Sequence, residues 1–279
     1  MRTLRAVVVL VTVGAGCAPS LSTFQPAHVA PKGHVLASGG FEIGVPVGGI
    51  VDVIDTGKML SDRARNGEAL SDDDKWRVFD AGVNLLLEGA TVGPHFSIAY
   101  TLVDRLEVNV RYAGTAWRLG GRYQILDHLR GAPFDMTAGI GVSRFTYEFP
   151  LSDQIPILEL DDFSRWQVDI PLLIGTSRDF FRVWLGPKIM LTSFETQLTL
   201  KIPATSDMTV ARFEGNAAWL GGQGGVAVGY KHFFVGFELT LAEGFGTAHF
   251  TSVGLNPPTH DTHLSSFIVF PSFGIMLEI

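Results

Sequence analysis

The stretch FFVGFELTL, residues 233–241, alternates between two kinds of side chain. Every second residue from Phe233 is large and apolar, whereas the residues between them include Gly236, Glu238 and Thr240. Because successive side chains of a β-strand point to opposite faces, a period of two with one apolar face predicts a strand. RVWLGPKIML (182–191) and LEVNVRY (106–112) repeat the pattern, so that it characterises the chain.

Ten segments of this kind follow one another to the last residue. They lie near 34–47, 92–102, 106–113, 116–126, 134–149, 166–178, 180–196, 208–230, 232–243 and 264–279. The region near 50–90 breaks the series, because residues 51–65 and 70–89 read as two helices. Ser71, followed by acids, is a suitable N-cap for the second helix.

The connections alternate between short and long, except for the third. Short periplasmic turns and longer extracellular loops are typical of transmembrane barrels. The chain is 46% hydrophobic and only 18% charged, yet no stretch after the first residues is long and apolar enough for a helical span. The sequence predicts an all-β fold: one closed antiparallel transmembrane β-barrel of about ten strands with a small helical insertion. A lipid-anchored soluble barrel of the lipocalin kind is the alternative, because alternation alone does not say what the apolar face meets.

The N-terminus reads as an export signal. Arg2 and Arg5 precede a short apolar run, and small residues follow it, as in a secretory signal peptide over 1–16. Gly14-Ala15-Gly16-Cys17 resembles the lipobox of bacterial lipoproteins, which implies lipidation of Cys17, although Gly14 departs from the usual Leu or Val. Residues 17–33, rich in Pro, Ser and Ala, then read as a lipidated tether to a barrel over 34–279. We expect the anchor on the periplasmic side of the outer membrane.

Several hairpin stretches carry a second resemblance. IAYTLVDRLEVNVRY, RLGGRYQILD, VDIPLLIG and VWLGPKIML resemble uncharacterised Gram-negative outer-membrane β-barrel proteins, some of them lipoproteins. The final stretch FIVFPSFGIMLEI resembles the C-terminal signal read by the barrel assembly machinery, although it ends in Ile279 where Phe is typical. The resemblance covers residues 34–279 and implies outer-membrane lipid and that machinery as partners.

Charged residues of both signs occupy the face opposite the apolar one. By parity they point into the lumen: Glu42, Glu107, Arg111, Arg118, Arg122, Asp169, Arg182, Lys188, Glu238 and Glu278. In a narrow barrel such charges should pair and close the interior. We therefore expect a structural or surface-interaction role, with a narrow conduit for small solutes or lipid as the alternative.

No catalytic motif emerges, so we expect neither an enzyme nor a cofactor. His260 and His263 lack a third metal ligand, and the acid pairs and triplets lack the spacing of a calcium loop. A net charge of −7 argues against a nucleic-acid partner. Predicted outer loops at 48–91, 150–165, 197–208 and 244–263 hold acids and aromatics together, and would suit an extracellular protein partner or a cation. These residues are Asp72, Asp73, Asp74, Trp76, Asp161, Asp162, Phe163, Phe245 and Phe250.

Overall fold

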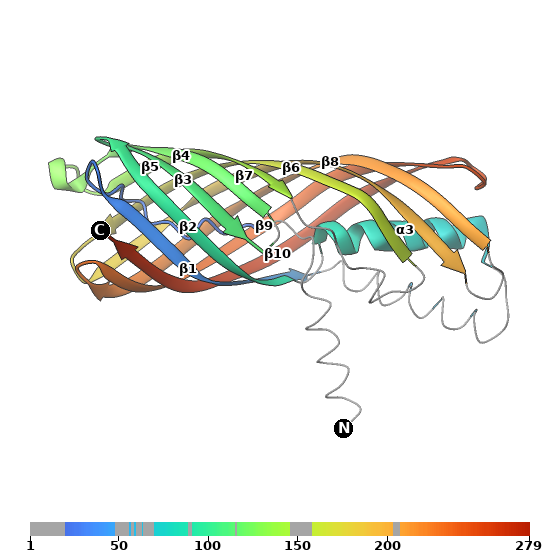
Figure 1. The fold of residues 1–279 in the computed structure, drawn as a ribbon, viewed down its shortest axis with the longest axis horizontal. Helices are drawn as coiled ribbons and strands as arrows, with labels where there is room; N and C mark the ends of the chain where they lie inside the picture. Colours follow the sequence, from blue (N-terminus) through green and yellow to red (C-terminus); the bar gives the residue numbers. More distant parts are fainter. Residues whose placement is uncertain are drawn as a thin grey trace, which may run out of the picture.

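The computed structural model forms one closed antiparallel barrel (Figure 1). It describes residues 20–47, 56, 59, 63, 70–88, 91–114, 116–145, 158–202 and 207–279. Within these residues ten strands follow one another around the barrel, and β1 closes the ring by pairing with β10. The predicted fold class and strand number are confirmed.

The strands fall into a short and a long group. The short strands are β1 (Val35–Val47), β2 (Thr91–Val103), β3 (Leu106–Ala113), β4 (Ala116–Leu126) and β5 (Asp135–Phe145). The long strands are β6 (Leu158–Ser177), β7 (Phe181–Ile202), β8 (Asp207–Tyr230), β9 (Phe233–Ser252) and β10 (Thr259–Glu278). The helix α3 spans Asp72–Glu88, and a 3-10 turn, η1, spans His128–Arg130.

One end of the barrel, called here the short-turn end, carries the tight connections after β2, β4, β6 and β8. β1 starts and β10 finishes there, where the main chains of Val35 and Ile279 exchange hydrogen bonds of 2.8 and 2.9 Å. The opposite end is the long-loop end, where α3 lies along the projecting strands (Figure 1).

The long strands have 20 to 24 residues, twice the roughly 9–11 that a membrane requires. Their surplus projects beyond β1–β5 at the long-loop end. We call residues 158–164, 193–202, 207–216, 247–252 and 259–265 the extension, and the remaining barrel the lower barrel. The predicted outer loops at 197–208 and 244–263 were therefore wrong, because most of these residues continue the strands; β6 likewise begins within the predicted loop at 150–165.

The outer wall of the lower barrel is apolar. Ile98, Leu119 and Leu185 each expose about three fifths of their surface, at 63%, 65% and 61%. A soluble barrel buries such residues inside, whereas a wall that contacts hydrocarbon presents them outward. The lower barrel is thus the membrane-spanning part, and the lipocalin-like alternative does not fit this surface.

The extension has the opposite polarity. Phe194, Phe213 and Phe250 point inward and are buried, whereas Glu195 and Glu214 point outward and are exposed. An apolar interior with a polar exterior is the arrangement of a strand whose outer side meets water. Each long strand therefore passes from lipid to water along its length.

The helix α3 fills the interior of the extension with its apolar face. Trp76, Phe79 and Val83 are buried against the aromatic residues of β8 and β9. Ser71 caps the helix as predicted: the Asp74 amide donates to Ser71 Oγ at 3.2 Å, and the Ser71 amide donates to the Asp74 carboxylate at 3.0 Å. The first predicted helix, 51–65, lies outside the described residues apart from three positions. No helix in the described part of the chain is long and apolar enough to cross a membrane.

Candidate functional site

The lumen of the lower barrel concentrates the charged residues that parity predicted. All ten point inward; nine are buried, and the Glu278 side chain is 13% exposed because it lies at the short-turn rim. They are Glu42, Glu107, Arg111, Arg118, Arg122, Asp169, Arg182, Lys188, Glu238 and Glu278.

Eight of these residues form four ion pairs within the lumen. Arg111 contacts Glu42 at 2.6 Å, and Arg182 contacts Glu278 at 2.5 Å. Two further pairs are bidentate through Nε and Nη2 of the arginine: Arg118 meets Asp169 at 2.7 and 2.9 Å, and Arg122 meets Glu107 at 2.7 and 2.8 Å. Bidentate pairing offsets much of the cost of burying each charge.

The N-terminal segment 20–30 lies inside this lumen, where the sequence had predicted a tether. Residues 21–30 are all buried, and we call 20–30 the lumen segment. It runs from Ser20, whose hydroxyl donates to Glu42, toward the short-turn end, where the Val29 amide donates to Gln124. The tether interpretation therefore does not hold for these residues, whereas residues 1–19, including Cys17, lie outside the described part.

The lumen cations hold the main chain of this segment rather than its side chains. Arg111 donates to the Ser22 carbonyl at 2.6 Å, and Lys188 donates to the Leu21 carbonyl at 2.6 Å. Arg122 donates to the carbonyls of Pro26 and His28. These contacts satisfy backbone acceptors that would otherwise be buried without a partner.

Glu238 supplies the complementary acceptor. Its Oε1 receives hydrogen bonds from the Thr23 and Phe24 amides at 2.9 and 3.0 Å and from the Ser22 hydroxyl at 2.6 Å. Its Oε2 accepts from Trp184 Nε1 at 2.8 Å. A buried carboxylate with four donors is well solvated by the protein, so Glu238 fixes the segment at its centre.

Phe24 is the apolar anchor of the segment. Its ring lies 5.0 Å from His95 and 6.5 Å from Trp184, centroid to centroid, and it is 1% exposed. The wall makes room through glycines: a Cβ at Gly274 would stand 3.0 Å from the Phe24 ring, and one at Gly236 would stand 3.2 Å from it. Phe24 has φ of 47°, an unfavourable value for a side-chain-bearing residue, so packing and hydrogen bonds hold it there.

Little open space remains around the segment. A cavity among Ser22, Arg118 and Asp169 has a volume of about 20 Å³, room for about one water molecule. In the described residues the segment thus fills the middle of the lumen.

The extension is closed by a second set of contacts. The Trp76 ring stacks on His260 at 5.2 Å, and His260 Nε2 lies 3.0 Å from Asp80 Oδ2. Burial raises the pKa of Asp80, while its hydrogen bond with His260 acts in the opposite direction. His260, considered from the sequence as a weak metal ligand, thus attaches α3 to β10.

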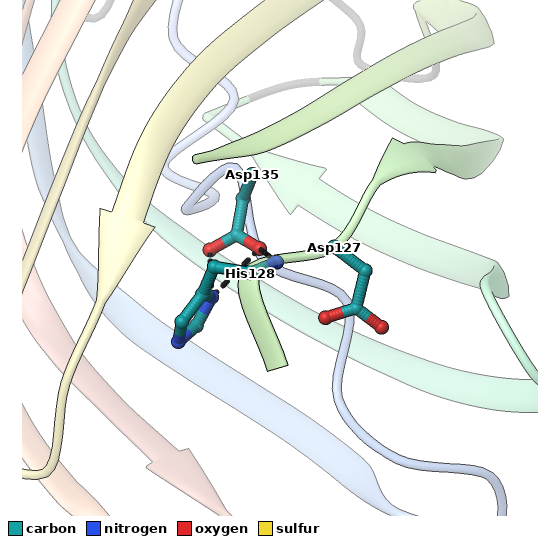
Figure 2. Close-up of side chains that lie close together, drawn as sticks. All are labelled: Asp127, His128 and Asp135. Atoms are coloured by element: carbon teal, nitrogen blue, oxygen red, sulfur yellow. Dashed lines mark hydrogen bonds and ion pairs between the residues drawn. The ribbon is translucent and has the colours of Figure 1, made fainter. Parts of the chain in front are cut away.

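Asp127, His128 and Asp135 form the group most similar to a metal centre, at the short-turn end (Figure 2). One potential ligand atom from each lies within 4.8 Å of the others. However, His128 Nδ1 already lies 2.8 Å from both Asp135 oxygens, and Asp135 also accepts from Gln124 Nε2. Asp127 caps η1 through the Leu129 amide. These hydrogen bonds already use the three side chains to close the β4–β5 connection, which gives the group a structural role.

The sequence reasoning missed the lumen segment, although one signal was present. Leu21, Phe24 and Val29 are apolar residues within a stretch otherwise typical of a linker. The structure adds that, of the ten predicted lumen charges, Lys188 and Glu238 stand outside the four ion pairs and both bind the segment.

The acid-and-aromatic surface expected at the outer loops is not present as predicted. Trp76 and Phe250 are 3% and 0% exposed and belong to the core of the extension. Asp74 is also buried, beside Ser71 and Arg63. Phe245 points outward from β9, and Asp161 is exposed.

Comparisons with known proteins identify no family. No family model and no curated protein matches the chain. Among solved structures, the outer membrane protein OprG from Pseudomonas aeruginosa aligns with 89% of this chain and 97% of its own, at 11% identity and a TM-score of 0.38. The CymD monoaromatic hydrocarbon channel aligns over 96% and 97%, at 10% identity and 0.29. Ail, the attachment invasion locus protein of Yersinia pestis, aligns over 89% and 99%, at 8% identity and 0.29. Similarity at this level does not indicate a shared function.

Proposed function

We propose that the chain is a Gram-negative outer-membrane barrel with a closed lumen, which serves as a structural scaffold for surface interaction at its long-loop end. Outer-membrane barrels have short periplasmic turns, so the short-turn end faces the periplasm in this proposal. The extension then rises from the cell surface.

The filling of the barrel at two levels carries this proposal. The lumen segment occupies the lower barrel through hydrogen bonds from Arg111, Lys188 and Arg122, while α3 occupies the extension. A solute would have to displace both to pass. Rigid projecting strands closed by a helix suit presentation of a surface better than transport.

Single-channel recording on planar bilayers tests the proposal with the full chain. We expect no steady conductance. A steady conductance that changes in Arg122→Ala or Glu238→Ala would show an open path lined by these residues and contradict it.

A conduit remains the second candidate, because polar atoms of the lumen wall lack partners. Both ring nitrogens of His95, Gln223 Nε2 and the Ser272 hydroxyl are buried without hydrogen bonds in the described structure. They would line a water-filled path if the lumen segment left. Conductance that appears only in Glu238→Ala, and not in Glu195→Gln on the outer wall, would favour this gated conduit.

We also propose lipidation of Cys17, which the resemblance to lipoproteins suggests. Incorporation of a palmitate analogue, lost in Cys17→Ser, is the expected result; label retained by that variant would contradict it.

The sequence alone suggested an anchor on the periplasmic side, but the course of the lumen segment favours the other side. Two residues separate Cys17 from Ser20, so at most about 11 Å of chain joins them, and the lumen segment runs from Ser20 toward the short-turn end. This direction favours an anchor near the long-loop end over the periplasmic side, and labelling an epitope inserted before Ser20 on intact cells distinguishes the two.

A further inference from the structure

Two hollows adjoin on the outer wall where β6–β9 pass from lipid to water. The upper one, of about 740 Å³, lies on the extension, and the lower one, of about 670 Å³, lies on the lower barrel. Trp166, Ser193, Asn216 and Thr247 line both, so the hollows form one groove.

The shape of the groove follows from strand register. Trp166 pairs with Ser193, Ser193 with Asn216, and Asn216 with Thr247, which places four neighbouring strands in one row. The last three side chains are short, whereas Trp166 is large and half exposed at 49%. A row of short side chains beside a large one leaves a trough. The Arg144 guanidinium lies 5.2 Å from the centre of the Trp166 ring and fixes its orientation.

The upper hollow is rich in hydrogen-bond acceptors. Glu195, Glu214, His249 and Asp261 pair in register across β7–β10 and all point outward. His249 Nδ1 lies 2.6 Å from Asp261 Oδ1. Among the described residues that line the hollow there is no lysine or arginine. Arg212 lies outside the lining, 3.7 Å from Glu195. The carboxylates of Glu195, Glu214 and Asp261 repel an anionic head group and favour a donor-rich, uncharged one.

The lower hollow is apolar. Val168, Leu191, Ala218 and Phe245 line it on the wall that contacts hydrocarbon. Its position directly below the acceptor row makes the groove amphipathic along its length.

We propose that this groove binds one glycolipid, with its uncharged sugar head in the upper hollow and an acyl chain in the lower one. Adjacent sugar hydroxyls present several donors at once, which matches the row of acceptors on rigid strands better than a single ammonium would. The half-exposed Trp166 at the boundary offers an apolar face with a polar edge, as interfacial tryptophans do. The site is independent of whether the lumen conducts, since it lies wholly on the outer wall.

Two tryptophans allow a matched test in the full chain. Trp166 lies in the groove, and Trp117 lies two strands away on β4, in the same row through Arg144 but outside the lining of either hollow, with a similar exposure of 53%. The Trp117→Phe variant leaves Trp166 as the lipid-exposed reporter, and Trp166→Phe leaves Trp117; the other three tryptophans are buried at 3% or less. Each variant is reconstituted in phosphatidylcholine vesicles, and fluorescence quenching by brominated-chain lipids is measured. The probes are glucosyl diacylglycerol, phosphatidylethanolamine, phosphatidylglycerol and phosphatidylcholine.

We expect glucosyl diacylglycerol to be preferred over phosphatidylcholine at Trp166 by about tenfold, the lower end of the effect of one hydrogen bond to a charged group, and not at Trp117. Glu214→Gln should reduce the preference at Trp166, whereas Glu243→Gln, outside the lining of either hollow, should leave it unchanged. Equal preference at the two tryptophans would overturn the site. A greater preference for phosphatidylethanolamine or phosphatidylglycerol would overturn the sugar assignment.

Discussion

The lower barrel and the extension are built from the same strands but have opposite polarity. On β9, Val235 and Leu241 point into the lipid and Glu238 into the lumen, whereas beyond Thr247 the outward residue is His249 and the inward one Phe250. The side-chain period of two is unbroken between them. Whether the outward or the inward residues are apolar therefore depends on whether lipid or water surrounds the wall. The position along the strand where this changes marks the edge of the membrane.

The two regions also differ in how they are closed. The lower barrel surrounds a segment held by charged side chains and main-chain hydrogen bonds, whereas the extension surrounds a helix held by aromatic packing. Removing an apolar group should destabilise the extension, and removing a charge should release the lumen segment. The predictions below separate these two modes of closure.

The largest effect is expected for Phe250→Ala in the extension. Phe250 is fully buried against Trp76, Phe79 and Phe213, so the free energy of unfolding of this region should fall by about 3–5 kcal/mol. Proteolysis near α3 and thermal denaturation in detergent measure it. Phe245→Ala on the same strand, which exposes 49% of its side chain, is the matched control and should change little. Equal effects of the two variants would show that the inside of the extension is not a packed core.

Glu238→Ala should lower the free energy required to open the lumen segment by about 1.5–3 kcal/mol, the value of hydrogen bonds to a charged group. Three donors of the segment lose their acceptor, so hydrogen exchange at Thr23 and Phe24 should accelerate. The barrel itself should keep its heat-modifiable gel mobility. Unchanged exchange at these amides would mean that Phe24 packing and the lumen cations hold the segment without Glu238.

Ser71→Ala should cost about 1 kcal/mol at neutral pH, as the loss of an N-cap does. The pKa of Asp74 lies below its usual value, chiefly because Ser71 donates a hydrogen bond to the carboxylate, and Arg63 also contributes. A carboxyl with a lowered folded-state pKa stabilises the fold above its unfolded-state pKa of about 3.9, and loses that stabilisation as the pH falls through the folded-state value. The difference between Ser71→Ala and the unmodified chain should therefore shrink in acid. A difference that stays constant down to about pH 2 would exclude the role of the Asp74 charge.

Arg130→Ala at the short-turn end should have the smallest effect. Arg130 and Asp104 are 2.7 Å apart, but their side chains are 51% and 60% exposed. Pairs as exposed as this contribute little, because water and salt screen the two charges. A clear loss of stability in thermal denaturation would show that the short turns contribute more to closure than their exposure suggests.

Much of the fold could be predicted from the sequence because alternation is a local signal. The ten strands and the inward side of the ten predicted lumen charges follow from parity, and the Ser71 cap follows from the residue types at a helix start. The strand at 208–230 matches β8 almost completely, but the outer ends of β6, β7, β9 and β10 were missed because the apolar parity changes: on β7, Leu191 points outward, whereas Phe194 and Leu198 point inward. A search for strands with one continuous apolar face therefore ends each strand at the residue where the apolar side changes.

The contents of the lumen could not be predicted in the same way. Which buried cation meets which carbonyl depends on contacts far apart in the chain, such as Lys188 with Leu21. Proline, serine and alanine in residues 18–31 are typical of linkers, and the composition does not reveal that the barrel provides acceptors and donors for their main chain.

A scan of single cysteines along β9 tests the change of polarity most directly. Cys17→Ser removes the native thiol, and spin labels are then placed at the outward positions Val235, Leu241, Phe245, Thr247, His249 and Thr251. Accessibility is compared for oxygen, which dissolves in lipid, and for a water-soluble nickel complex. The structure predicts oxygen-dominated accessibility up to Phe245 and nickel-dominated accessibility from Thr247 onward. Oxygen-dominated accessibility continuing through Thr251, or nickel-dominated accessibility already at Val235 and Leu241, would contradict it.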